Sequence, residues 1–291
     1  MAADMPEGDT LFRIARQLRP VLTGRTIIES RAWRPRGGPA IDADSLVGRT
    51  VSGVEAVGKH LLIPFDDGRV VHSHLGMTGA WHVYREGDSW RKPERAAALV
   101  LTTTDHTVVN FSPKQLELVT ERALKRDAHL RRLGPDLMLP DVDLAEVRQR
   151  LRTHNRTPIG EAVMNQTIAA GIGNVYKSES LFFAKLNPWD AVGMFDDDRL
   201  LAYLRQTHAL MRRNRGGGMR TTRHSGGPRL WVYGRSGEAC LVCGEVIQMR
   251  RQGDQGRSTY WCPLCQPALS AVPRSVSDAN IKRKPPIKGG G

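Results

Sequence analysis

The sequence predicts an α+β protein built from more than one domain. With 291 residues it exceeds the usual size of a single domain, and its 40% hydrophobic content is enough for real cores. Short strand-like runs occupy residues 26–119, helical periodicity occupies residues 144–211, and four cysteines lie between residues 240 and 265. The expected order is therefore strands, then helices, then a metal-binding module.

An amphipathic helix is expected at the front of the chain, from Glu7 to Leu22. Apolar residues recur there at helical spacing, and Gly24 follows as a stop signal. Because such a helix buries its apolar stripe against a core, it holds its first turn rigidly. Residues just before this helix are therefore expected to have a fixed position.

A segment of short strands follows the helix. Turn residues such as Asp66-Asp67-Gly68 separate several apolar or alternating runs, which is typical of a sandwich or barrel. The stretch from Arg31 to Asp44 is rich in Pro, Gly and Arg and indicates a loop. The expected strands are Thr26–Glu29, Val51–Val57, His60–Phe65, Arg69–Leu75, Ala80–Tyr84, Ala97–Leu101, Thr107–Phe111 and Leu116–Val119.

A boundary is expected near residues 130–140, where helical patterns replace the strands. Between two of the helices lies the turn Ala170–Tyr176, which contains a Gly-x-Gly-Asn pattern. The free N–H groups of such a helix start suit a phosphate, but ordinary helix turns also use Gly and Asn, so both interpretations stay open. The expected helices are Leu144–Leu151, Ile159–Ala169, Val175–Lys185 and Asp197–Met211.

Two further segments are basic and rich in glycine or proline. Residues Arg212–Arg229 are expected to form a mobile loop, either a linker into the cysteine module or a lid over a substrate. Residues 268–291 are expected to be a disordered tail that adds at most nonspecific attraction to a partner.

The charge balance favours nucleic acid as the partner. Lys and Arg number 43 against 30 Asp and Glu, a net charge of +13, and only +4 of this excess belongs to the tail. No apolar run approaches the ~18 to 20 residues of a membrane span, and the N-terminus lacks the apolar core of a secretory signal. We therefore expect a cytoplasmic protein with no membrane partner.

The cysteine spacing predicts one structural zinc ion. Cys240 and Cys243 form one Cys-x2-Cys knuckle, and Cys262 and Cys265 form a second one. Four thiolates can surround one tetrahedral Zn²⁺, whereas the redox poise of the cytosol disfavours two disulfides.

The N-terminal run Met5-Pro6-Glu7 offers a nucleophile under one condition. If translation starts at Met5 and this methionine is removed, Pro6 carries a free secondary amine beside a carboxylate. Within a longer chain the same nitrogen is an amide without an available lone pair. We therefore expect residues 1–5 to be an extension that is absent from the mature protein.

Motifs from Met5 to Gln266 together resemble the formamidopyrimidine-DNA glycosylase and endonuclease VIII family of bifunctional base-excision repair enzymes, closer to its bacterial endonuclease VIII branch. Single motifs are weak signals, but their order and spacing are specific. They are Pro6-Glu7-Gly8, Val57–Leu62, His74–Gly79, Leu133–Asp136, Ala170–Tyr176 and Gly256–Cys262.

The resemblance implies a specific domain order. It expects a catalytic β-sandwich with flanking helices at 6–130, a helix-two-turn-helix domain at 131–230, and a four-cysteine zinc finger at 231–267, before the basic tail. Duplex DNA that contains a damaged base or an abasic site would lie in the cleft between the halves. The expected state is a monomeric, nucleoid-associated bacterial enzyme.

The resemblance also assigns catalytic roles. The Pro6 amine would attack C1′ of the flipped nucleotide, displace the base and form a Schiff base, and β/δ-elimination would then cleave the strand. Glu7 is assigned to proton transfer at the sugar ring oxygen and Lys59 to the proton of β-elimination; an exposed strand lysine is the alternative for Lys59. Arg257 is assigned to δ-elimination and to phosphate binding.

Further residues match DNA-binding positions of the family. Asn174 and Arg132 would hold backbone phosphates, and Met77 would fill the gap left by the flipped base, with a buried core methionine as the alternative. The other histidines, namely His72, His74 and His82, are expected to be strand residues rather than metal ligands.

Two differences from the family pattern bear on which damaged base the protein removes. The region Val109–Lys114 lacks the arginine that the formamidopyrimidine branch carries there, which favours the endonuclease VIII branch and oxidised pyrimidines. Gly76 stands where well-known members of that branch have glutamine, so the opposite-base preference stays open. Two alternatives to an active enzyme also remain: a non-catalytic damaged-DNA-binding protein, if Pro6 is not the N-terminus, and a zinc-finger regulator that needs neither Pro6 nor Lys59.

Overall fold

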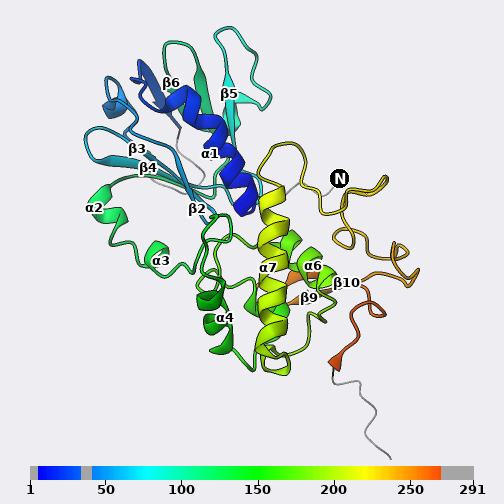
Figure 1. Cartoon of the computed structure of the whole chain (residues 1–291). Coiled ribbons are helices and arrows are strands. Elements are labelled where there is room, and N and C mark those ends of the chain that lie inside the picture. Colours follow the sequence, from blue (N-terminus) through cyan, green and yellow to red (C-terminus); the bar gives the residue numbers. More distant parts are fainter. Residues whose placement is uncertain (1–5, 34–40, 270–291) are drawn as a thin grey trace, which may run out of the picture.

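The computed structural model describes residues 6–33 and 41–269. A β-sandwich forms one half of the molecule, and a helical half that carries a small β-ribbon lies beyond it (Figure 1). The expected extension 1–5 and nearly all of the expected tail lie outside the described residues.

Helix α1 (Gly8–Leu22) packs along the sandwich on strands β2 and β3 and also touches α7. Its apolar stripe is buried as the sequence predicts, with Leu11, Ala15, Leu18 and Leu22 at 0 or 1% exposure. The residue that precedes the helix, Glu7, makes no side-chain cap to it. The carboxylate of Glu7 is therefore available for another partner.

Two four-stranded antiparallel sheets form the sandwich. Their facing residues, among them Leu61, Ile63, Leu99 and Val108, form the first core together with α1. One sheet has the order β2 (Glu55–Val57), β3 (His60–Pro64), β4 (Arg69–His74) and β8 (Gln115–Thr120). The other has the order β1 (Glu29–Ala32), β6 (Ala97–Thr102), β7 (Thr107–Phe111) and β5 (Ala80–Tyr84).

Two strand predictions are wrong at their starts. The strand expected at Thr26–Glu29 begins at Glu29 and runs into the expected loop, because β1 finds its partner β6 only from there on. The strand expected at Val51–Val57 is reduced to Glu55–Val57. Thr26 and Val51 make only isolated bridges, to Thr50 and Phe65.

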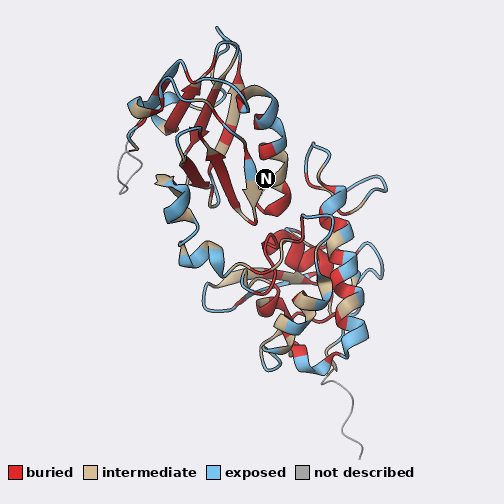
Figure 2. Ribbon diagram, turned by 60° about the vertical axis from the view of Figure 1, so that its left-hand side comes forward, coloured by how far each residue is buried: buried red, intermediate tan, exposed pale blue. Residues whose placement is uncertain are grey.

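The helical half has its own core around α4 (Leu144–Arg152), α5 (Ile159–Ala162), α6 (Asn174–Phe183) and α7 (Asp197–Arg213). The short helices α2 (Glu121–Leu124) and α3 (Ala128–Arg131) connect it to the sandwich and are exposed on the surface (Figure 2). Single turns of 3₁₀ helix occur at η1 (Asp44–Leu46), η2 (Glu94–Ala96) and η3 (Val192–Met194).

The helix expected at Ile159–Ala169 is wrong in length, since it ends at Ala162. Beyond it, Asn165 Oδ1 accepts hydrogen bonds from the backbone N–H and the hydroxyl of Thr167, at 3.0 and 2.8 Å. Such local side-chain bonds compete with a helix and favour a turn.

The two-stranded antiparallel ribbon of β9 (Gln248–Gln252) and β10 (Arg257–Trp261) packs on α6. Its tip lies at residues 253–256, where Gly253 and Gly256 both have positive φ angles. None of the helices in the described ranges is both long and apolar enough to cross a membrane.

Candidate active site

A cavity of about 550 Å³ brings together residues that are far apart in the sequence. It lies where the start of α1, the β2–β3 turn, the loops after β4 and β7, the start of α6 and the tip of the ribbon meet. Among the residues that line it are Pro6, Glu7, Lys59, His74, Gly76, Met77, Lys114, His129, Asn174 and Arg257.

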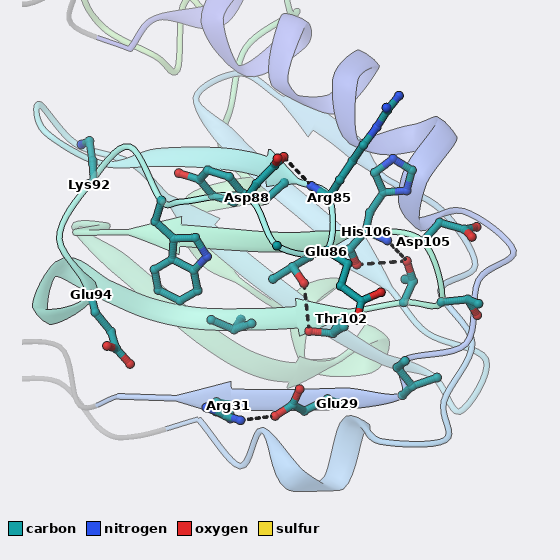
Figure 3. Close-up of a pocket in the computed structure, with 18 of the residues that line it drawn as sticks. Glu29, Arg31, Arg85, Glu86, Asp88, Lys92, Glu94, Thr102, Asp105 and His106 are labelled. Atoms are coloured by element: carbon teal, nitrogen blue, oxygen red, sulfur yellow. Dashed lines mark hydrogen bonds and ion pairs between the residues drawn. The ribbon is translucent and has the colours of Figure 1, made fainter.

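A larger cavity, of about 750 Å³, lies on the outer face of the second sheet (Figure 3). Some of its polar side chains pair with one another: Arg31 pairs with Glu29, and the hydroxyls of Thr102 and Thr107 are 3.4 Å apart. None of the residues that the sequence singles out for chemistry lines it. The smaller cavity is therefore the candidate active site.

The carboxylate of Glu7 is bound at the N-terminus of α6. It accepts hydrogen bonds from the backbone N–H groups of Gly173 at 3.1 Å, Val175 at 2.7 Å and Tyr176 at 3.2 Å. The residue is 1% exposed, and the helix dipole adds to the attraction. Pro6, which is partly exposed, is thereby fixed beside a buried carboxylate.

The Gly-x-Gly-Asn turn makes this contact possible. A Cβ atom on Gly173 would lie 2.3 Å from Cδ of Glu7, and one on Gly8 would lie 2.8 Å from Cα of Gly171. Gly171 also has φ +99°, which favours glycine. The phosphate interpretation of this helix start is therefore wrong for its first N–H groups, because they bind Glu7.

A second buried network lies behind Glu7. The Nη2 atom of Arg220 donates to Oδ1 of Asp9 at 2.6 Å, and Nη1 lies 3.9 Å from Oε1 of Glu7. The guanidinium also lies over the ring of Tyr176, 5.0 Å from its centroid. Although burial alone would lower it, the carboxylates of Glu7 and Asp9 raise the pKa of Arg220.

This network limits the prediction of a mobile loop at Arg212–Arg229. Residues 214–229 form neither helix nor strand, as a loop requires, but Arg220 holds them to α1. The first two residues of that stretch belong to α7, and Arg220 is only 1% exposed. An arginine held by two acidic side chains in the interior anchors the segment against α1.

Lys59 lies in the tight turn between β2 and β3, so the prediction of a strand lysine is wrong. Gly58 before it has φ +57°, and its N–H donates to Oδ2 of Asp136 at 2.7 Å. Burial lowers the pKa of Lys59 to about 8, Glu7 acts in the opposite direction, and Arg257 lowers it further. The amine therefore faces the cavity with an appreciable neutral fraction near pH 8.

Met77 is 62% exposed at the cavity, which excludes the buried-core alternative. The residue before it, Gly76, has φ +65°, and a Cβ atom there would lie 2.8 Å from Cβ of Lys114. The loop therefore requires glycine at this position, and the side chain of Lys114 takes the adjacent space.

The expected phosphate-binding residues divide into two groups. Asn174 and Arg257 both line the cavity; Nδ2 of Asn174 donates to the hydroxyl of Ser258 at 3.2 Å, and Nη2 of Arg257 donates to Oε1 of Gln255 at 2.9 Å. Arg132 is exposed after α3 and does not line the cavity. The histidines His72, His74 and His82 lie on strands, as the sequence predicts.

The four cysteines form the one cluster of potential metal ligands found in residues 6–33 and 41–269. Their Sγ atoms all lie within 4.8 Å of one another, with pair distances of 3.8 Å for Cys240–Cys265 and 3.4 Å for Cys243–Cys262 and Cys243–Cys265. Four thiolates around a tetrahedral Zn²⁺, with Zn–S bonds of about 2.3 Å, require pair distances of roughly 3.8 Å. The cluster therefore fits structural zinc.

Several residues of the site have no signal of their own in the sequence. Asp9 and Arg220 look like ordinary surface charges, and Lys177 looks like a solvated helix lysine, yet all three are buried. The sequence does contain one indication of this network. Lys177 follows Asn174 by three residues, so the two side chains are expected to lie on the same face of the helix.

Comparison with known proteins agrees with this arrangement. Residues 5–124 match the formamidopyrimidine-DNA glycosylase N-terminal domain, residues 133–224 match the H2TH domain of that enzyme, and residues 237–268 match the zinc finger found in FPG and IleRS. The expected fold class, including the helix-two-turn-helix domain and the four-cysteine finger, is thus confirmed.

Curated relatives match over their whole length. A probable endonuclease 8 2 of Streptomyces coelicolor is 39% identical, covering 96% of this chain and 100% of the relative. A DNA-(apurinic or apyrimidinic site) lyase Nei2 of Mycolicibacterium smegmatis is 37% identical, covering 91% of this chain and 100% of the relative.

Solved structures share the fold. Lactococcus lactis Fpg in complex with abasic-site DNA superposes with a TM-score of 0.76 at 24% identity, covering 89% of this chain and 99% of that chain. The same enzyme with DNA that contains an oxidised pyrimidine gives 0.76 at 25% identity, covering 90% and 100%. The chain therefore belongs to the formamidopyrimidine-DNA glycosylase and endonuclease 8 family of DNA-repair enzymes.

Proposed function

We propose that this protein is a bifunctional DNA glycosylase and AP lyase of base-excision repair, with Pro6 as the N-terminal nucleophile. The observation that carries the proposal is the cavity in which Pro6, the fixed carboxylate of Glu7, Lys59 and Arg257 meet. The named relatives, an endonuclease 8 and an AP lyase, support the same reaction class.

In the first step the lone pair of the Pro6 amine forms a bond to C1′ of the damaged nucleotide. The C1′–base bond breaks with its electron pair going to the leaving base, and opening of the sugar ring gives an iminium at C1′. Glu7 directly follows Pro6, and its buried carboxylate would stabilise the cation. Glu7 is also our candidate for proton transfer at the ring oxygen.

In the second step the iminium acts as an electron sink. Loss of a proton from C2′ forms a carbon–carbon double bond, and the C3′–O bond breaks, which releases the 3′ phosphate as the β-elimination product. Lys59 has a pKa of about 8 and lies in the cavity, so it suits proton transfer near the leaving phosphate. Arg257 is proposed to act in the further δ-elimination that releases the 5′ phosphate.

Binding of the DNA backbone is proposed for Asn174 and Arg257, because both line the cavity and both carry N–H donors. Arg132 is proposed to contact a phosphate outside the cavity, where its exposed side chain is accessible. Met77 is exposed next to the cavity and suits the space left by a flipped nucleotide.

Oxidised pyrimidines are proposed as the favoured lesions, on the grounds of the closer resemblance to the endonuclease 8 branch. The catalytic residues all come from one chain, which supports a monomer acting on duplex DNA. One zinc ion is proposed for the finger.

We also propose the domain limits 6–130 for the catalytic domain, 131–230 for the helix-two-turn-helix domain and 231–267 for the zinc finger.

Borohydride trapping tests the proposal. Protein that begins at Pro6 should give a covalent adduct with duplex DNA that contains an oxidised pyrimidine. Protein that retains Met1–Met5, in which the Pro6 nitrogen is an amide, should give none while still binding the DNA. No adduct from authentic Pro6 protein would exclude the mechanism. N-terminal sequencing of protein from its native host separates the alternative: a chain that starts at Ala2 supports a damage-binding protein without catalysis.

A further inference from the structure

Lys177 is a buried amine that the proposed chemistry does not use. It lies in the middle of α6 and is 1% exposed. Its Nζ atom donates to Oγ1 of Thr259 at 2.7 Å and to the carbonyl oxygen of Ser258 at 3.3 Å. No ion pair of this amine with a carboxylate is present in residues 6–33 and 41–269.

Both acceptors belong to β10 and directly follow Arg257. The hydroxyl of Thr259 in turn donates to Oε1 of Gln252 at 2.9 Å, and Nε2 of Gln252 donates to the carbonyl of Pro188 at 2.8 Å. One chain of hydrogen bonds therefore runs from α6 through both strands of the ribbon and back into the helical half.

The neighbours of Lys177 on α6 extend this contact. Asn174 donates to the hydroxyl of Ser258 at 3.2 Å, and the hydroxyl of Ser178 accepts from the N–H of Tyr260 at 3.3 Å. Three consecutive ribbon residues thus bond to one face of the helix whose N-terminus holds Glu7. A shift of the ribbon along α6 would move Arg257 relative to Glu7.

An apolar side chain at position 177 would pack between α6 and the ribbon without the cost of removing a charged group from water. Burial lowers the pKa of Lys177 to about 7, whereas Glu7 raises it and Arg257 lowers it further. Of the three α6 side chains that bond to the ribbon, Asn174 and Ser178 each make one hydrogen bond with it, whereas the amine of Lys177 donates to two acceptors, Ser258 and Thr259.

We propose that Lys177 is a positioning residue of the lyase reaction, which sets the register of the zinc ribbon on α6 so that Arg257 faces the cavity beside Glu7. This rests on the proposed function, because Arg257 must act on the DNA for its position to matter. The amine itself does not line the cavity and is not assigned a contact with DNA.

A double-mutant cycle tests this role. Single-turnover cleavage of abasic-site DNA is measured for the wild type, Lys177→Met, Arg257→Ala and the double variant, with zinc content and thermal unfolding as folding checks. Lys177→Met should lower the cleavage rate about tenfold, and it should have almost no further effect in the Arg257→Ala background, because coupled residues are non-additive. Lys177→Arg should restore part of the rate.

Borohydride trapping adds a second readout. The Schiff-base step depends on Pro6 and Glu7, so Lys177→Met should keep the adduct although it cleaves the strand more slowly than the wild type. Lys125→Met is the matched control, since Lys125 is exposed and makes no side-chain hydrogen bond or ion pair among the described residues.

The outcomes separate the two proposals. The positioning role would be overturned if Lys177→Met and Arg257→Ala lowered the cleavage rate independently, so that their effects multiplied in the double variant. It would also be overturned if a folded Lys177→Met cleaved the DNA at the wild-type rate. An inactive wild-type protein that begins at Pro6 would instead overturn the proposed function. If Lys177→Met does not fold, Lys177→Gln retains a donor for Thr259 and is expected to give the same non-additive pattern.

Discussion

Oε1 of Glu7 accepts a hydrogen bond of 2.7 Å from the backbone N–H of Val175, although the two residues are 168 positions apart in the sequence. This bond joins the start of α1, which belongs to the sandwich, to the start of α6, which belongs to the helical half. The carboxylate of Glu7, in our proposed catalytic pair Pro6-Glu7, therefore has this position only when the two halves are packed together.

Replacement of Glu7 by Gln should abolish base excision and also lower stability. An amide NH₂ group cannot accept a hydrogen bond, so at least one of the three N–H groups at the start of α6 loses its partner, which costs about 1 to 3 kcal/mol. Single-turnover excision, DNA binding and thermal unfolding measure the effects. Unchanged unfolding would show that the carboxylate does not hold α6, and Glu29→Gln on the exposed edge strand is the control.

Gly173→Ala should reduce activity by displacing Glu7, although Gly173 itself supplies no reacting group. The added Cβ atom would lie 2.3 Å from Cδ of Glu7, so the carboxylate must leave its place. We expect a loss of at least about tenfold in the excision rate, since small displacements of catalytic groups have effects of this size or larger. Gly216→Ala is the matched control, because a Cβ atom at that residue would have no neighbour within 4 Å. Equal rates for both variants would contradict the contact.

The lyase rate should depend on pH through Lys59. Its pKa of about 8 means that the ammonium form is lost as the pH rises through that value. If the ammonium donates a proton, cleavage of abasic-site DNA should slow above about pH 8, and Lys59→Arg should move this limb to higher pH because arginine stays protonated. Rates are measured between about pH 6 and 9.5, with Lys125→Arg as control. If the cleavage rate of Lys59→Arg decreased over the same pH range as that of the wild type, the decrease would belong to another titrating group.

Acid should destabilise the sandwich through His60. Burial lowers the pKa of this histidine to about 3, with His74, His72 and His129 adding to the effect and Asp127 opposing it. Because the folded-state pKa lies below the ordinary value of 6.5, the unfolded chain binds the proton first, and stability falls as the pH drops below 6.5.

The expected slope is up to about 1.4 kcal/mol per pH unit for one such group. His60→Asn should flatten the dependence between about pH 6.5 and 4, measured by urea unfolding, although the variant is less stable at pH 7 since it loses the 2.9 Å contact with His72. His224→Asn, at an exposed position, should leave the slope unchanged. Parallel curves for wild type and His60→Asn would reject this role.

Removal of one zinc ligand should unfold the finger but not the sandwich. Cys243→Ser leaves three thiolates, so zinc affinity and the folding that depends on it should be lost. Metal content, DNA affinity and thermal unfolding are the measurements, and the sandwich transition should persist because its core is separate from the residues around the cysteines. Leu264→Ala, inside the second knuckle and 61% exposed, should keep all three properties. Normal DNA binding by zinc-free Cys243→Ser would contradict the expected contribution of the finger.

Local patterns predict much of the fold. The amphipathic stripe of α1, the turn-separated strands and the paired cysteine knuckles depend on neighbouring residues, and the structure contains them with small shifts at their ends. The shifts at β1 and β2 arise because a strand extends only as far as its partner does. Periodicity does not reveal the end of α5, because Asn165 bonds to its own turn.

The sequence by itself determined the order of elements, the zinc ligands and the family motifs, because spacing along the chain carries this information. Only the tertiary structure decided that the Gly-x-Gly-Asn turn holds Glu7, that Arg220 is buried against Asp9, and that Lys177 reaches the ribbon. The physical reason is that a buried charge is stable only with partners, and these partners come from segments that meet when the chain folds.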